Sequence, residues 1–149
     1  MASPVEERCT AEIVRLHDAF VEWFTGSSDN TRDAYDSEIG SALSPSFSMV
    51  TPSGNVVPAV LLGERLRGAH GSHSERGIEI EIRNAQVASS VGLVHLVRYE
   101  EWQRSGGRPP VAETARISTA LLREEEGNGP HGLMWMHVHE TWMPEKGPS

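Results

Sequence analysis

The feature that most constrains this chain is a change in its hydrophobic period near residue 71. Before that point, apolar residues recur every three or four positions, as they do on one face of an α-helix. After it, Ile78, Ile80 and Ile82 alternate with charged residues, which is the pattern of a strand with one solvated face. Helices first and strands second predict an α+β domain whose helices pack on one face of a sheet.

Three helices are predicted in the first half. The first begins at a capping signature, Ser3 with Glu6, and ends at Gly26. A second, with a weaker apolar stripe, is expected within residues 30–44, and a third within residues 57–69. At about 1.5 Å per residue, the first helix is long enough to lie across a whole sheet.

A short strand is predicted over residues 47–50, and the strand that contains the alternating isoleucines follows the third helix. Three longer strands are then expected over residues 91–103, 113–124 and 133–143, joined by loops rich in glycine and proline. Short connections imply antiparallel neighbours. Strands of roughly eleven residues exceed the usual five or six, so we expect a strongly curved sheet that wraps around an interior.

The length of 149 residues suits one hydrophobic core. We therefore expect a single domain over residues 1–143, followed by a flexible tail over residues 144–149. The net charge is −8 and the chain has one lysine, Lys146, while its arginines are scattered singly among glutamates. Without a basic stripe we expect no binding to nucleic acid.

The chain has one cysteine, Cys9, at an amphipathic position of the first predicted helix. A single cysteine excludes an internal disulfide and a metal site built from paired cysteines, and it favours a reducing compartment. We find no run of apolar residues long enough to span a membrane and no leader-like apolar segment. We therefore expect a cytoplasmic protein that does not associate with membranes.

The order helix, helix, short strand, turn, helix and curved meander resembles the nuclear transport factor 2-like superfamily over nearly the whole chain. Residues 47–54 look like the first strand and turn of its small SnoaL-like members, and residues 135–142 look like their last strand. The resemblance implies a cone-shaped α+β barrel, a pocket between sheet and helices, and a homodimer formed through the sheet. Because the superfamily includes ketosteroid isomerases, scytalone dehydratase and polyketide cyclases, it leaves the activity open.

The last strand carries the most reactive side chains in the sequence. Its alternation places Trp135, His137 and His139 on one face, and Val138 and Glu140 on the other. Both faces are largely apolar, so the sequence does not decide which one lines the pocket. We favour the face with the histidines, because a cavity needs a few polar groups in an apolar wall.

The same two histidines have a spacing that suits a metal, with His95 as a third ligand, but the sequence supplies no carboxylate ligand and we assign no metal site. Core or solvated histidines are the competing interpretation.

Acid–base catalysis is constrained by the distribution of aspartate. The sheet half contains none, so the aspartate base on which ketosteroid isomerases and SnoaL-like cyclases rely has no counterpart here. Glutamates do occur on the strands, but they alternate with apolar residues as solvated side chains do. Resemblance to scytalone dehydratase instead nominates His137 or His139 as the base and Tyr35 as a hydrogen-bond donor.

We predict that five further residues contact a ligand. They are Trp23, Phe24, His95, Arg116 and Trp135. The leading hypothesis is a protein of the SnoaL-like type that binds a small, mostly apolar organic molecule without a cofactor. Two alternatives stay open: a cofactor-free isomerase, dehydratase or cyclase that uses a pocket histidine, and a non-catalytic dimeric interaction module.

Overall fold

The computed structural model describes residues 2–107 and 109–148. Three α-helices and a single 3-10 turn, at Gly40–Ala42, occur in its first half. The helices are α1 (Pro4–Thr25), α2 (Arg32–Glu38) and α3 (Ala59–Gly68). Ser3 caps α1 as predicted, since its side chain accepts a hydrogen bond from the Glu6 N–H.

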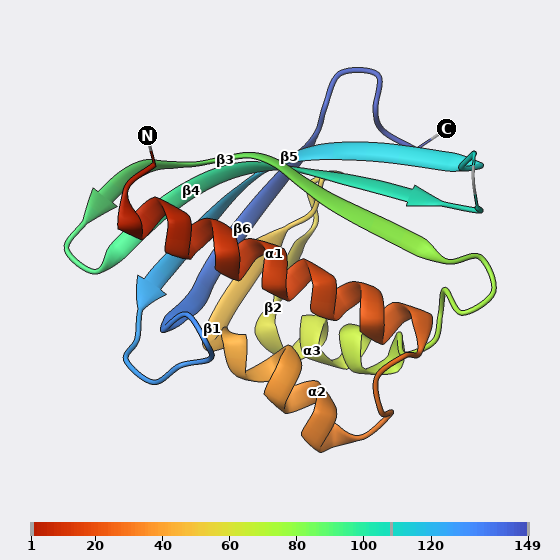
Figure 1. The fold of residues 1–149 in the computed structure, drawn as a ribbon, viewed down its shortest axis with the longest axis horizontal. Helices are drawn as coiled ribbons and strands as arrows, with labels where there is room; N and C mark the ends of the chain where they lie inside the picture. The colour runs from red at the N-terminus through yellow and green to blue at the C-terminus, as the bar shows by residue number, and fades with distance from the viewer. Residues whose placement is uncertain (1, 108, 149) are drawn as a thin grey trace.

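The strands form one six-stranded sheet in the order β2, β1, β6, β5, β4, β3. Their bounds are β1 (Leu43–Val50), β2 (Val56–Pro58), β3 (Ile78–Val91), β4 (Val94–Ser105), β5 (Ala112–Glu124) and β6 (Leu133–Trp142). The meander from β3 to β6 is antiparallel as expected, but β1 pairs parallel to β6, so the sheet is mixed. It curves strongly without closing, because β2 and β3 form two free edges (Figure 1). The predicted α+β architecture is confirmed.

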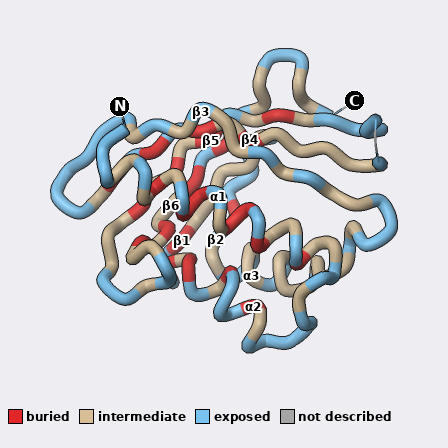
Figure 2. The backbone as a smooth tube through the Cα atoms, viewed as in Figure 1, coloured by how far each residue is buried: buried red, intermediate tan, exposed pale blue. Residues whose placement is uncertain are grey.

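The first helix lies across the concave face of the sheet, and α2 and α3 close the lower side (Figure 1). Its apolar stripe supplies the centre of the core, where Cys9, Ile13, Leu16 and Trp23 are buried (Figure 2). The helix ends where Gly26 adopts a left-handed conformation, with a φ of 81°. Helices and sheet therefore meet over one continuous apolar interior.

Two predicted boundaries are wrong. The second helix ends at Glu38 rather than near residues 42–44, and the chain passes through the 3-10 turn directly into β1, which includes Pro45. β3 continues to Val91, where the sequence predicts the start of the next strand, and β4 begins only at Val94. Register shifts on either side of Gln86 interrupt the two-residue period of β3 beyond its alternating isoleucines. Asn84, with a φ of 55°, lies in the first of these irregular segments.

A bulge in β6 decides which way its side chains point. Leu122 of β5 pairs with Trp135, but the preceding Leu121 pairs with His137, so Met136 is an extra residue in β6. After the bulge, the buried positions are Val138 and Glu140. The concave face therefore holds Trp135 before the bulge and the even-numbered residues after it.

Residues 144–148 follow the last strand along β5. The Ala115 N–H donates to the Lys146 carbonyl, and the Lys146 N–H donates to the Met143 carbonyl. The predicted tail thus makes backbone contacts with the sheet that its composition did not suggest. Within the described ranges, none of the helices combines the length and apolar character needed to cross a membrane.

Candidate functional site: a pocket with one charged end

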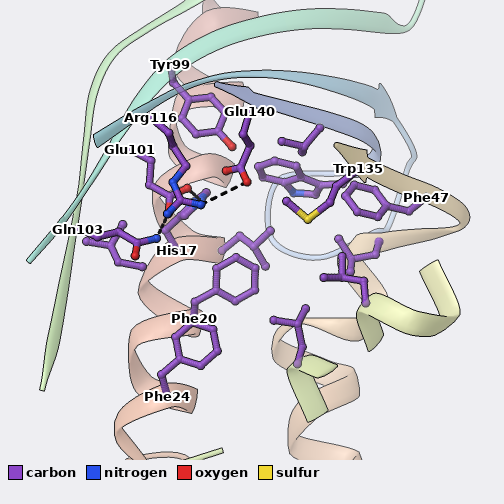
Figure 3. A pocket seen from close by; sticks show the side chains of 17 residues that line it. His17, Phe20, Phe24, Phe47, Tyr99, Glu101, Gln103, Arg116, Trp135 and Glu140 are labelled. Atoms are coloured by element: carbon purple, nitrogen blue, oxygen red, sulfur yellow. Dashed lines mark hydrogen bonds and ion pairs between the residues drawn. The ribbon is translucent and has the colours of Figure 1, made fainter. Parts of the chain in front are cut away.

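A cavity of about 160 Å³ lies between α1, α3 and the concave face of the sheet. Figure 3 shows its side chains: aromatic and aliphatic groups surround most of it, and charged groups gather at one end. The apolar wall includes Phe20, Phe24, Phe47, Met49, Leu62, Leu66 and Trp135. The polar end consists of His17, Glu101, Gln103, Arg116 and Glu140, which we call the charged cluster.

Periodicity in two elements assembles this site. On α1, His17, Phe20 and Phe24 follow at helical spacing and face the cavity together. On the sheet, Glu101 of β4 lies opposite Arg116 of β5. In the adjacent cross-strand row, Tyr99, Ser118 and Glu140 lie side by side on β4, β5 and β6. Gln103 lies one row further along β4, opposite Thr114. The charged cluster is therefore held by four elements, with its sheet members in three successive rows.

His17 and Glu101 form the firmest pair of the cluster. The Nδ1 of His17 lies 2.7 Å from the Ile13 carbonyl oxygen, to which it donates, and its Nε2 lies 3.0 Å from a Glu101 carboxylate oxygen. A carbonyl can only accept, so a Glu101 carboxylate requires both ring nitrogens to carry protons. The geometry describes an imidazolium paired with a carboxylate.

Electrostatics agree with that assignment. Burial alone disfavours both charged forms, but each partner reverses the effect on the other. The Glu101 carboxylate raises the pKa of His17 above its usual value. The charge and hydrogen bond of His17 lower the pKa of Glu101 to about 2.

Glu140 is held much more loosely than Glu101. Its two oxygens are each 3.4 Å from a donor, one from Arg116 Nη1 and the other from the Ser118 hydroxyl. Yet the residue is only 5% exposed, the same as Glu101. Burial and the negative charge of Glu101 raise the pKa of Glu140 to about 7, against smaller opposing effects of Arg116 and His17.

Such an arrangement has two chemical capacities. A carboxyl group with a pKa near neutrality can accept or release a proton at physiological pH. The guanidinium of Arg116, which lies over the Trp142 ring with its centre 4.7 Å from the ring centroid, can bind an anionic group. Both groups lie at the end of an otherwise apolar cavity.

Glu12, on α1, holds Trp135 in the aromatic wall of the cavity. This buried carboxylate accepts hydrogen bonds from Trp135 Nε1 at 2.9 Å, from Arg15 at two atoms and from His131 Nδ1. Burial would raise its pKa, but these donors lower it below the usual value. Trp135 is thereby held in one orientation against the pocket.

Three of the residues predicted to contact a ligand lie in the cavity wall. Phe24 comes from α1, Arg116 from β5 and Trp135 from β6. Their presence at one cavity makes a ligand contact geometrically available to each.

Trp23 and Tyr35 lie elsewhere, in the packing between helices. The Trp23 ring is 5.5 Å from that of Tyr35, and its Nε1 donates to the Leu66 carbonyl oxygen on α3. Neither residue belongs to the cavity wall. Trp23 takes the position of α1 that faces α2 and α3, whereas Phe24, one residue along the helix, lines the cavity.

The three strand histidines do not converge. His95 is buried at the opposite end of the interior, where its Nδ1 lies 2.7 Å from the Ser90 hydroxyl and its Nε2 2.9 Å from Glu124. His137 and His139 lie on the outer face of the sheet, the first bonded to Ser48 and the second exposed. The expectation that their face lines the pocket is wrong, because the bulge at Met136 inverts the alternation. Among the described residues, no three metal-ligating side chains gather in one place.

Sequence reasoning missed the charged cluster apart from Arg116. The alternation that favours solvated positions for the strand glutamates is misleading at Glu101 and Glu140. Glu101 shares the parity of His95, Val97 and Tyr99, which are buried. For His17, the usable signal was its spacing from Ile13 and Phe20 on the apolar stripe. No such signal marked Glu140, because its orientation depends on the bulge.

Comparisons with known proteins place this chain in a family. The model of the sucrose-6-phosphate phosphohydrolase C-terminal family matches residues 9–144. Sucrose-phosphatase 2 of Nicotiana tabacum is 30% identical over 138 residues, which are 89% of this chain and 30% of the relative. The chain thus spans less than a third of the length of that curated relative.

Solved structures support the superfamily that the sequence resembled. An NTF-2 like protein of unknown function from Pseudomonas aeruginosa has 29% identity and a TM-score of 0.76, with 91% of this chain and 98% of that chain covered. A putative ketosteroid isomerase from Shewanella frigidimarina, at 10% identity and a TM-score of 0.59 over 87% and 90% of the two chains, shares the fold. The chain belongs to the sucrose-6-phosphate phosphohydrolase C-terminal family, on a nuclear transport factor 2-like fold.

Proposed function

We propose that this domain binds a small, mostly apolar organic molecule in the cavity between α1 and the sheet. The observation that carries the proposal is a cavity with an aromatic and aliphatic wall and one charged end. Ligand sites commonly combine an apolar lining with a few polar groups that orient the ligand. Phe24 and Trp135 would contact the apolar body of the ligand, and Arg116 its polar group.

The size of the cavity limits the ligand. At about 160 Å³ it is close to a cavity of about 150 Å³ that holds benzene, and well below the roughly 300 Å³ at which sites for drug-sized ligands begin. One ring, or a short chain, fits. A disaccharide phosphate does not fit inside this volume, so we do not transfer the substrate named for the sucrose-phosphatase relatives to this pocket.

Filling the cavity tests the proposal. Leu62 lines the pocket from α3, while its neighbour Leu61 is 37% exposed, so Leu62→Trp and Leu61→Trp are matched variants on one helix. Calorimetric titration with phenol and with toluene should show binding to the parent protein and to L61W, and loss of binding in L62W. Failure of the parent protein to bind either probe, or unchanged binding by L62W, would contradict the proposal.

A second function, proton transfer without a cofactor, is favoured by Glu140 alone. Its carboxyl lines the cavity, is weakly hydrogen bonded and has a pKa of about 7, the range in which a general base works best. It replaces the strand histidines as the candidate base of an isomerase. The test is exchange of the α-hydrogens of cyclopentanone for solvent deuterium, followed by NMR. Exchange that Glu140→Gln abolishes supports the isomerase, and exchange no faster than in buffer removes it.

We also propose that the domain forms a homodimer through the outer face of the sheet. Leu96 and Ile117 expose 37% and 38% of their surface there, on adjacent strands. His137 and His139 share this face, so this proposal gives them a place in the interface. Sedimentation at micromolar concentration should show a dimer that Ile117→Lys dissociates. Val56→Lys, at an exposed residue of the edge strand β2, is the control and should leave the dimer intact.

A further inference from the structure

Some hydrogen-bonding groups of the charged cluster are left unsatisfied within the cluster and face the cavity. What we infer from them rests on the proposed ligand-binding function. His17 and Arg116 supply two positive charges, and Glu101 and Glu140 supply two negative ones when both are ionised. The pair of His17 and Glu101 is complete, because Gln103 Nε2 also donates to Glu101 at 2.5 Å. The second pair is Arg116 with Glu140. The protonation state of Glu140 therefore decides the net charge that the cluster presents to the cavity.

That second pair is incomplete. Arg116 Nη1 reaches Glu140 only at 3.4 Å, and Arg116 Nε is buried without a hydrogen-bond partner. A donor–acceptor distance of that length is at the weak end of hydrogen bonding. Both residues line the cavity, as Figure 3 shows. A largely covered guanidinium, whose Nε is buried, and a buried carboxyl thus lie at the cavity end without satisfying each other.

The groups that face Glu140 come from three elements. They are His17 on α1, Glu101 and Tyr99 on β4, and Arg116 on β5. Tyr99 stays neutral, because burial raises the pKa of its hydroxyl well above the usual value. With Glu140 protonated, the cluster carries one net positive charge at a cavity that has otherwise apolar walls.

We propose that the ligand is a small monocarboxylate, of one ring or a short chain, whose carboxylate takes the place of Glu140 as the partner of Arg116 while Glu140 takes up one proton. The Glu140 carboxyl then donates this proton in a hydrogen bond to the ligand carboxylate. Charge is balanced before and after binding, since one anion enters and one solvent proton neutralises Glu140. The raised pKa of Glu140 supports this exchange, because the protonated form is accessible near neutral pH.

The experiment compares benzoate with its neutral isostere benzamide by calorimetry, at about pH 6 and about pH 8.5. Above the pKa of Glu140, the Kd for benzoate should rise roughly tenfold per pH unit, whereas the Kd for benzamide should change little. Repeating the titration at the higher pH in buffers of different ionisation enthalpy should report uptake of about one proton per benzoate.

Two variants divide the roles. Glu140→Gln should keep benzoate binding and lose both its pH dependence and the proton uptake. Arg116→Gln should lose benzoate and keep benzamide. Glu113→Gln, on the outer face of β5, is the matched control and should behave as the parent protein.

The outcomes separate this inference from the function on which it rests. Benzamide bound as tightly as benzoate, without proton uptake, overturns the monocarboxylate assignment and leaves the pocket in place. A pH dependence that persists in E140Q overturns the role of Glu140. Binding of neither probe by the parent protein overturns both proposals.

Discussion

The two faces of strands β3 to β5 carry similar residues under opposite conditions. On the outer face, Arg83 pairs with Glu81 at 2.8 Å and Arg104 with Glu113 at 2.6 Å, and all four side chains are between a quarter and a half exposed. On the inner face, His17, Glu101 and Glu140 of the charged cluster are buried against the cavity. Water screens the outer pairs, whereas the inner groups depend on one another for their charge state. Burial, rather than residue type, makes one cluster a candidate site.

Breaking the inner pair should give the largest effect. His17→Leu keeps an apolar side chain on α1 but leaves the buried Glu101 without its imidazolium partner. We expect the free energy of unfolding to fall by about 3–5 kcal/mol at neutral pH, as for other buried pairs that lose one member. Urea denaturation measures it. The double variant His17→Leu with Glu101→Gln removes the stranded charge and should recover much of the loss; no recovery would contradict the ion-pair explanation.

Glu140 should give an intermediate effect that depends on pH. Burial and the negative charge of Glu101 raise its pKa from the ordinary 4.5 to about 7 in the folded state. The folded protein therefore binds an extra proton between these values, and stability should fall as pH rises through them. Glu140→Gln should remove a decline on the order of 1–3 kcal/mol between about pH 5 and about pH 8.

His17 adds a decline of the same sign, because its folded pKa is also raised and its contribution is lost as pH rises through that value. A residual slope is therefore expected in E140Q, measured by urea denaturation across the pH range. A slope as steep as that of the parent protein would show that Glu140 is not the group that titrates.

The outer cluster should give the smallest effect. Arg104→Gln breaks the contacts with Glu113 and Glu81 on a solvated face. We expect a shift of the urea midpoint smaller than that of either inner variant, and one that disappears at high salt because water and ions screen these charges. A shift equal to that of His17→Leu would mean that the two faces do not differ as described.

Much of the fold followed from the sequence because local patterns encode it. The capping signature at Ser3 and the alternation of Ile78, Ile80 and Ile82 each reflect contacts within a few residues, and both predictions hold in the structure. The second helix was predicted too long, since its weak stripe gave no firm end. The parallel pairing of β1 with β6 joins segments far apart in the chain, and no local pattern encodes it.

The candidate site was predictable only in part. Phe24 and Trp135 were found because large aromatic residues on an apolar stripe or strand point to a wall, and Arg116 because a charge within a buried strand requires a partner. The strand histidines were misplaced for one reason: a single inserted residue, Met136, exchanges the two faces of β6. That exchange also carried Glu140 into the cavity.

By itself, the sequence determined the order of helices and strands and their amphipathic faces, because both depend on side-chain periodicity along the chain, and its resemblance to known proteins indicated the superfamily. Tertiary structure alone decided that His17, Glu101, Arg116 and Glu140 meet at one end of a small cavity. The physical reason is that their pairing crosses four elements, and their charge states arise from burial and from neighbours more than twenty residues away.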